Sequence, residues 1–358
     1  MNTFMWGVSI DNMWIYAGTP PPKSIVIPHA PYVRLPNGNF SSAMMCENSD
    51  KDAGNSPSSS ESRRTLCRDV ARHLKNCGIN FVRGWFQWNF FQKEILRNSE
   101  QVFDFPLDDF VQAMNDEGIK IIAALGNGYY RFLPEHIDVD DSRQYVARLT
   151  EASREIVRHY SGKIYMWQLE NEPNWWLEHY WIGWRKGLIW FKRDLGATIL
   201  SELQRVVREE DGNTLTMVNL EADTAKVFFR TFSKYCDILG LDYYPNYIRS
   251  DPIDASGIRS IAREVRRMVG NSVVISETGY PSGPRLLGFS ETKQAGYVDA
   301  VTRESYASDD IQGLGMWRLS DTYWHSFPLQ ENSFGLLART GSPKKAWHEY
   351  VDQISLLK

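Results

Sequence analysis

Two glutamates stand directly after short apolar segments that are typical of buried parallel strands. Glu172 follows segment 164–169 within WQLENEPNWW, and Glu277 follows segment 272–276 within VVISETGYPSG. Two carboxyl groups that flank one bond are what glycoside hydrolysis requires, because one protonates the departing oxygen and the other attacks or supports the anomeric carbon. Neither tripeptide, NEP or ETG, is specific by itself. The pair predicts carbohydrate chemistry if the fold brings the two strand ends together.

Eight such segments alternate with helical patterns along the chain, and this alternation predicts a parallel sheet. Each is short, nearly apolar on both faces, and flanked by Gly, Asn, Asp or Pro, as expected for a strand that is covered on both sides. The expected strands are 4–10, 80–85, 119–125, 164–169, 215–220, 236–243, 272–276 and 311–317, and the clearest helices are 58–76, 106–115, 187–210 and 252–269.

Eight strand–helix units favour a closed (β/α)8 TIM barrel of the α/β class over an open doubly wound sheet. No glycine-rich phosphate loop follows the first expected strand, which weakens the dinucleotide-binding alternative. Without a linker or a second hydrophobic core, we expect residues 1–358 to form one catalytic domain. The first strand-to-helix connection, 11–57, is long. Sites of this fold lie at the strand C-termini, where the fourth and seventh strands face one another across the mouth.

The sequence resembles the retaining β-glycosidases of clan A, which share a (β/α)8 barrel. ETGYPSG is similar to the nucleophile segment of plant-type β-1,3-glucanases, and GLDYYPN to strand-six segments of β-1,4-galactanases and β-glucosidases. VRGWFQW and MWRLSDTYW resemble strand-two and strand-eight segments of the clan. The resemblance implies that Glu172 is the acid/base, that Asn171 binds the sugar 2-hydroxyl, and that Glu277 is the nucleophile of a covalent glycosyl-enzyme.

The nucleophile must stay ionised, so we expect a cation and hydroxyl donors beside it. Arg83 and Tyr244 are the candidates, with Tyr243 as the rival of Tyr244 because neighbours in a strand point to opposite faces. The acid needs an apolar setting and a negative neighbour, for which the tryptophans at 175, 176, 181 and 184 are available, and Trp175 is expected to bind substrate.

Further residues near the expected mouth have both functional and structural interpretations. Trp317 ends the eighth strand, and we expect it to contact the sugar, whose C–H face suits a flat ring. Asn127 and Asp11 are further candidates. Glu170, two residues before Glu172, is better interpreted as an inner-barrel carboxylate paired with an arginine, because a buried charge demands a partner.

Composition excludes several classes of protein. The 40 Lys and Arg against 44 Asp and Glu give a net charge of −4, which does not suggest a partner such as nucleic acid or a membrane surface. No segment is apolar enough to cross a membrane. The four cysteines form no CxxC pair and the seven histidines no metal-binding pattern, so we expect no cofactor and no metal. With no signal-peptide pattern at Met1, we expect a cytoplasmic protein.

The leading hypothesis is therefore a retaining β-glycosidase that hydrolyses β-linked oligosaccharides or glycosides. An endo-acting β-glycanase of the glucanase, mannanase or galactanase type would use the same two glutamates, and so would a transglycosylase. A non-catalytic carbohydrate-binding barrel is the alternative from another class, and the presence of both glutamates speaks against it.

Overall fold

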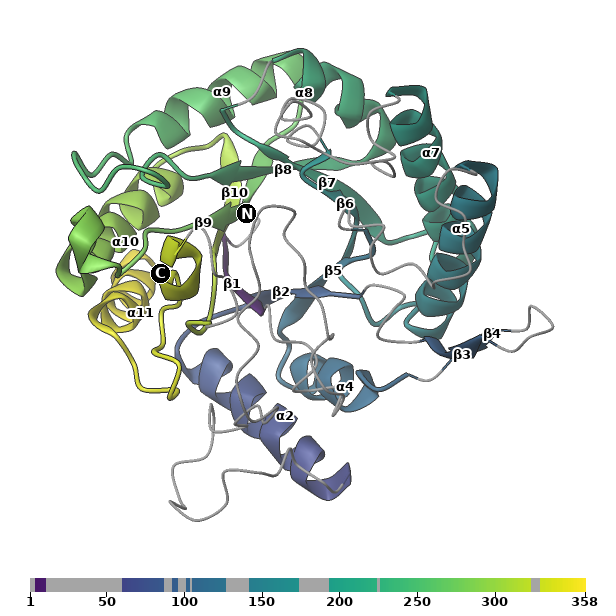
Figure 1. The fold of residues 1–358 in the computed structure, drawn as a ribbon, viewed down its shortest axis with the longest axis horizontal. Coiled ribbons are helices and arrows are strands. Elements are labelled where there is room, and N and C mark those ends of the chain that lie inside the picture. The colour runs from purple at the N-terminus through teal and green to yellow at the C-terminus, as the bar shows by residue number, and fades with distance from the viewer. Residues whose placement is uncertain are drawn as a thin grey trace.

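The computed structural model describes residues 4–10, 60–86, 92–95, 101–103, 105–126, 142–173, 193–223, 226–322 and 329–358. Its centre is a closed barrel of parallel strands with helices around the outside (Figure 1). The barrel strands are β1 (Met5–Ile10), β2 (Phe81–Trp85), β5 (Lys120–Ala124), β6 (Met166–Asn171), β7 (Leu215–Glu221), β8 (Ile238–Tyr243), β9 (Val273–Thr278) and β10 (Ile311–Met316). The expected (β/α)8 barrel is thus confirmed, with β6 and β9 as its fourth and seventh strands.

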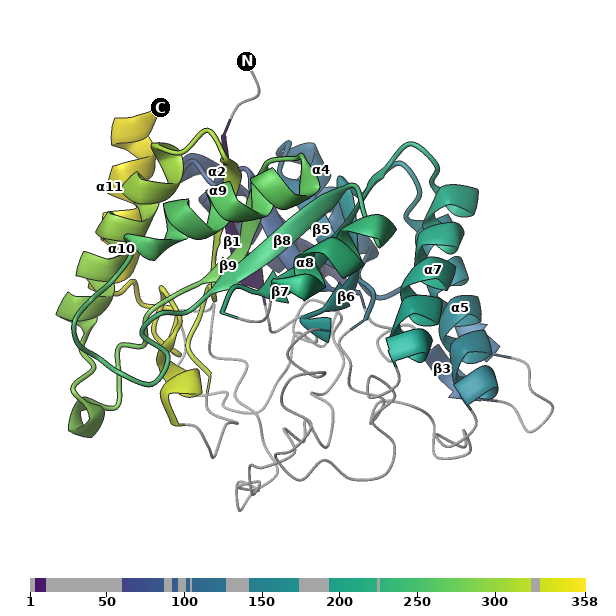
Figure 2. The same ribbon diagram turned by 90° about the horizontal axis from the view of Figure 1, so that it is seen from above.

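The helices lie outside the strands, as a second view shows (Figure 2). They are α2 (Ser60–Asn76), α4 (Asp108–Asp116), α5 (Ser142–His159), α7 (Arg193–Glu210), α8 (Val227–Phe232), α9 (Gly257–Val269), α10 (Glu291–Tyr306) and α11 (Lys345–Leu357), with short 3-10 turns η3 (Ser233–Tyr235), η4 (Arg285–Leu287) and η5 (Leu329–Ser333). None of the helices that the structure describes is long and apolar enough to span a membrane.

Helix α9 shows how the sequence produces these elements. Its buried residues Ile258, Ala262 and Val265 follow the spacing of one helical face, and Gly270 ends the helix in the left-handed conformation that favours glycine. Proline at 252 does not begin this helix, contrary to the expectation for 252–269. Asp254 accepts hydrogen bonds from both the backbone and the hydroxyl of Ser256, and this local turn delays the helix to Gly257.

One element was not expected from the sequence. Strands β3 (Gln92–Ile95) and β4 (Gln101–Phe103) form an antiparallel pair between β2 and α4, outside the barrel. Both are three or four residues long and lack a strong alternating pattern, so sequence gave little signal for them.

The inside of the barrel has an apolar layer below a polar one. The apolar layer consists of six side chains from six strands, namely Met5, Phe81, Ile122, Met166, Met217 and Val274, all buried. Phe81 fills the space beside Gly7, where a Cβ atom would lie 2.4 Å from its ring. Glycine at position 7 therefore lets the ring close the centre of the barrel.

The polar layer begins two residues further along the barrel strands. Because side chains alternate between the two faces of a strand, Phe81 is followed on the inner face by Arg83, Met217 by Asn219, and Gly240 by Asp242. Arg83, Asn219 and Asp242 are all at most 2% exposed. The polar layer lies toward the C-terminal ends of the strands, which is where this fold builds its sites.

Candidate active site

Irregular pairing at β6 and β9 sets the direction of the two glutamate segments. The register of β6 against β7 shifts between Gln168 and Glu170, and that of β9 shifts against β8 and β10 near Ser276. Simple alternation would send Gln168 and Asn171 to opposite faces, yet both contact Arg83. Such bulges re-aim side chains.

Glu277 lies between a cation and a hydroxyl donor. Nη1 of Arg83 is 2.6 Å from Oε1 of Glu277, and the two side chains are only 1% and 7% exposed. The hydroxyl of Tyr244 donates to Oε2 of Glu277 at 2.7 Å. Arg83 therefore compensates the charge of the carboxylate at one oxygen, and Tyr244 fixes its orientation at the other.

Tyr243, the alternative to Tyr244, lies on the outer side of β8. Its hydroxyl packs against Gly257 at the start of α9, where a Cβ atom would be 2.7 Å away, and its backbone carbonyl accepts a hydrogen bond from the hydroxyl of Thr278. The two adjacent tyrosine side chains thus point to opposite faces of the sheet.

Arg83 ties β2 to the fourth and seventh barrel strands. Besides its ion pair with Glu277, it donates from Nε to Oε1 of Gln168 at 2.6 Å and from Nη2 to Oδ1 of Asn171 at 2.7 Å. Its guanidinium carbon is 4.7 Å from the ring centre of Trp85. With three different partners and an aromatic ring beneath it, Arg83 has a fixed position in the barrel.

Asn171 presents its amide in one orientation. Its Oδ1 accepts hydrogen bonds from Arg83 and from Nδ2 of Asn219, at 2.7 and 2.8 Å, and a longer one from Gln168 at 3.4 Å. These donors occupy the oxygen, which leaves the Nδ2 hydrogens to be donated to another acceptor.

Glu172 is half-buried and has a pKa well above its usual range. Burial is the largest cause, and the negative charges of Asp242, Glu277 and Glu221 add to it, while Arg83 opposes the shift. A carboxyl group in this setting keeps its proton at a pH where an exposed glutamate would lose it.

Asp242 is the main residue that sequence reasoning missed. It is fully buried, and burial together with the charge of Glu277 raises its pKa, against the effects of Arg83, Ser276 and Asn219. Its Oδ1 accepts from the Ser276 hydroxyl at 2.7 Å, and its Oδ2 accepts from Nδ2 of Asn219. The available signal was its spacing, since Asp242 stands two residues before Tyr244 and so shares its face.

The carboxylate of Glu170 lies between the backbone of Asn171 and Gly126. Its Oε1 accepts the backbone N–H of Asn171 at 2.9 Å, and its Oε2 packs against Gly126, where a Cβ atom would be 2.3 Å away. The absence of a side chain at Gly126 makes room for this carboxylate at the end of β5.

Trp317 follows β10 and is half-buried beside the polar layer. Its ring stands nearly perpendicular to that of Trp85, with ring centres 6.4 Å apart, and the two form an aromatic edge next to Arg83. The other expected site residues, Trp175, Asn127, Asp11 and the tryptophans at 176, 181 and 184, lie outside the described residues.

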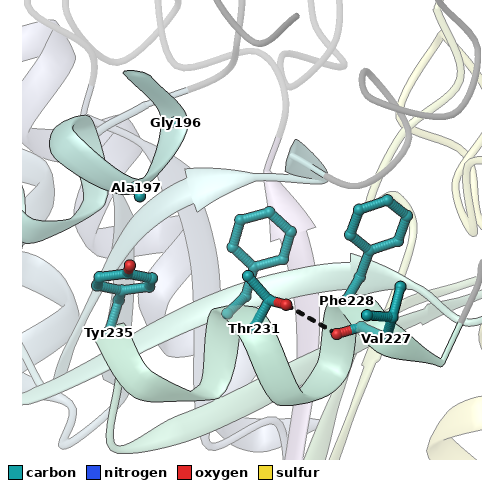
Figure 3. A pocket seen from close by; sticks show the side chains of 7 residues that line it. Gly196, Ala197, Val227, Phe228, Thr231 and Tyr235 are labelled. Carbon is teal, nitrogen blue, oxygen red and sulfur yellow. Dashed lines mark hydrogen bonds between the residues drawn. The ribbon is translucent and has the colours of Figure 1, made fainter. Parts of the chain in front are cut away.

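A cavity of about 100 Å³ lies on the outside of the barrel, between the start of α7 and α8 (Figure 3). It shares no residue with the site formed by Arg83, Asn171, Glu172, Tyr244 and Glu277. Its lining is mainly apolar: Gly196, Ala197, Val227, Phe228, Thr231, Phe232 and Tyr235. Within the described ranges, no group of three or more His, Cys, Asp or Glu side chains is arranged to hold a metal ion.

Comparison with known proteins identifies the fold. No protein-family model and no curated protein matches the sequence. A GH5_18 structure from Streptomyces cattleya, solved with GlcNAc, matches with a TM-score of 0.67 at 13% identity, over 82% of this chain and 75% of that one.

Two larger proteins share the same fold. A family 39 glycoside hydrolase from Bacteroides cellulosilyticus WH2 matches with a TM-score of 0.59 at 17% identity, over 82% of this chain and 61% of that one. A GH2 β-galacturonidase from Eisenbergiella tayi matches with a TM-score of 0.56 at 15% identity, over 82% of this chain and 48% of that one. The chain therefore spans about half the length of the β-galacturonidase, and it has the barrel fold of these glycoside hydrolases.

Proposed function

We propose that this protein is a retaining β-glycoside hydrolase whose nucleophile is Glu277 and whose acid/base is Glu172. The observation that carries the proposal is the contrast between two carboxyl groups on facing strands. Glu277 lies against Arg83 and Tyr244, whereas burial and three negative neighbours raise the pKa of Glu172. An attacking carboxylate and a proton-donating acid need these opposite settings.

In the first step, an oxygen of Glu277 attacks the anomeric carbon, and the glycosidic bond breaks as Glu172 gives its proton to the leaving oxygen. Asn171 supports this step by donating from Nδ2 to the sugar 2-hydroxyl, since donors already occupy its Oδ1. The product of the step is an ester between Glu277 and the sugar.

In the second step, the charge of Glu277 has disappeared into the ester. One of the causes that raise the pKa of Glu172 is thereby removed, so ionised Glu172 accepts a proton from water as the water attacks the anomeric carbon. The released Glu277 carboxylate returns to its contacts with Arg83 and Tyr244.

We further propose that residues 1–358 act as one catalytic domain in the cytoplasm, on β-linked oligosaccharides or glycosides. The thiols of Cys67, Cys77 and Cys236 are free, in keeping with a reducing compartment. Neither cofactor nor nucleic acid has a part in this mechanism. An endo-acting glycanase and a transglycosylase would use the same two carboxyl groups and differ in the acceptor and in the length of chain bound.

The test is the intact mass of the protein after incubation with 2-deoxy-2-fluoro β-glycosides of glucose, galactose, mannose and xylose. The proposal expects an adduct on the peptide that contains Glu277, and none on Glu277→Gln, while Glu264→Gln in an exposed ion pair serves as the control. An adduct on a different carboxylate would exclude Glu277 as nucleophile. If no sugar labels the protein, hydrolysis of a polysaccharide by wild type but not by Glu277→Gln would indicate endo action. If wild type hydrolyses no polysaccharide either, the result would favour a carbohydrate-binding protein.

A further inference from the structure

The backbone of Glu172 has a conformation that side chains disfavour. Its φ is 44°, and among the described residues it is the one non-glycine with positive φ. A left-handed backbone in a residue with a Cβ atom persists only where the surroundings hold it. The structure must therefore contain a contact that stabilises Glu172 in this conformation.

Asn219 on β7 makes that contact. Its Oδ1 accepts the backbone N–H of Glu172 at 3.3 Å, and the side chain is fully buried. The same oxygen accepts from Nε2 of Gln168 at 2.7 Å. Through one atom, Asn219 therefore holds both Gln168, which precedes the bulge in β6, and Glu172, which follows the end of β6.

The amide of Asn219 can adopt only one orientation. Its Nδ2 donates to Oδ1 of Asn171 at 2.8 Å and to the carboxylate of Asp242. A flipped amide would turn its oxygen toward these two acceptors and its hydrogens toward the N–H groups of Gln168 and Glu172. Both donors and both acceptor positions are thus matched in the observed orientation only.

We propose that Asn219 is a positioning residue for the acid/base Glu172, which it holds in the left-handed conformation from the inner face of β7, with Asp242 fixing the amide in turn. This inference rests on the proposed function. Asn219 itself does not touch the reacting atoms, so its removal should impair proton donation to the leaving group and spare the attack by Glu277.

The experiment compares Asn219→Ala with wild type on aryl β-glycosides whose leaving groups range from dinitrophenol to phenol. General acid help is worth about 10²- to 10⁴-fold and matters most for poor leaving groups. We therefore expect kcat/KM to fall about tenfold more for the phenyl than for the dinitrophenyl glycoside. Asn219→Leu, which keeps the side-chain volume without an acceptor, gives the same readout if the alanine variant does not fold.

Two controls separate positioning from general damage. Asn80→Ala removes an asparagine that bonds the backbone of Trp6 and Phe4 at the opposite end of the barrel, and it should lower Tm without changing the leaving-group dependence. In a Glu172→Ala background, Asn219→Ala should change kcat/KM by less than about twofold, because coupled residues are not additive.

Equal losses for all leaving groups, or a full additional loss in the Glu172→Ala background, would overturn the role of Asn219 and leave the proposed function standing. If wild type itself hydrolyses none of the glycosides or polysaccharides, the proposed function fails and this inference fails with it.

Discussion

Tyr244 donates its hydroxyl hydrogen to Glu277 at 2.7 Å, while its neighbour Tyr243 points to the outside of the same strand. A hydrogen bond to a charged group contributes about 1.5–3 kcal/mol, which corresponds to roughly 10- to 150-fold in rate if it acts in the transition state. We expect Tyr244→Phe to lower kcat/KM within that range and Tyr243→Phe to leave it almost unchanged. Steady-state kinetics with one aryl glycoside decides this, and equal effects of the two variants would contradict the arrangement.

The charge of Asp242 should be visible in the pH profile. Glu172 must be protonated for the first step, so kcat/KM falls as the pH rises through the raised pKa of Glu172. Asp242→Asn keeps an acceptor for Asn219 and a partner for Ser276 but removes a negative neighbour. The pKa of Glu172 then falls, and the alkaline limb of kcat/KM should move to lower pH. An unchanged alkaline limb would show that the negative charge of Asp242 does not act on Glu172.

The carboxyl group of Glu172 should reduce the stability of the protein at higher pH. Because the pKa of folded Glu172 lies well above the ordinary glutamate value of 4.5, the folded state resists its ionisation. Stability then falls as the pH rises from about 4.5 through the raised pKa. Glu172→Gln removes this loss, so its Tm should exceed that of wild type at neutral pH and approach it at pH 4. An equal difference in Tm at both pH values would count against the raised pKa.

The close contact of Gly7 with Phe81 predicts an effect on stability that does not depend on the proposed function. A Cβ atom at position 7 would lie 2.4 Å from the Phe81 ring, and overpacking of this kind costs about 1–3 kcal/mol. We expect Gly7→Ala to lower the free energy of unfolding by about that amount, measured by urea denaturation. Gly296→Ala on α10, where the nearest side-chain atom is 3.9 Å away, is the matched control and should not destabilise.

The sequence predicts the barrel well because its signals are local. Short apolar segments and helix boundaries such as Gly270 follow from neighbouring residues, and the ends of the eight strands were predicted to within a few positions. The placement of carboxyl groups at the ends of β6 and β9 also follows from this pattern, because Glu172 and Glu277 come directly after apolar runs.

The remainder of the site depends on contacts between distant strands. Bulges near Gln168 and Ser276 change which side chains face inward, and no local sequence signal marks them. Asn219 and Asp242 are buried polar residues that are hydrogen-bonded to each other. Because they stand on different strands, the sequence shows no role for either until β7 and β8 are known to be adjacent. The short β3–β4 pair was missed for the opposite reason, since its segments are too short to show a periodicity.

The layer formed by Met5, Phe81, Ile122, Met166, Met217 and Val274 closes the interior of the barrel below Arg83. A ligand above Arg83 has no exit through the floor, because aromatic and aliphatic side chains close it. A sugar that reaches Arg83 must therefore enter from the C-terminal ends of the strands. For the proposed reaction, water then reaches the ester from the same end of the barrel through which the leaving group departs.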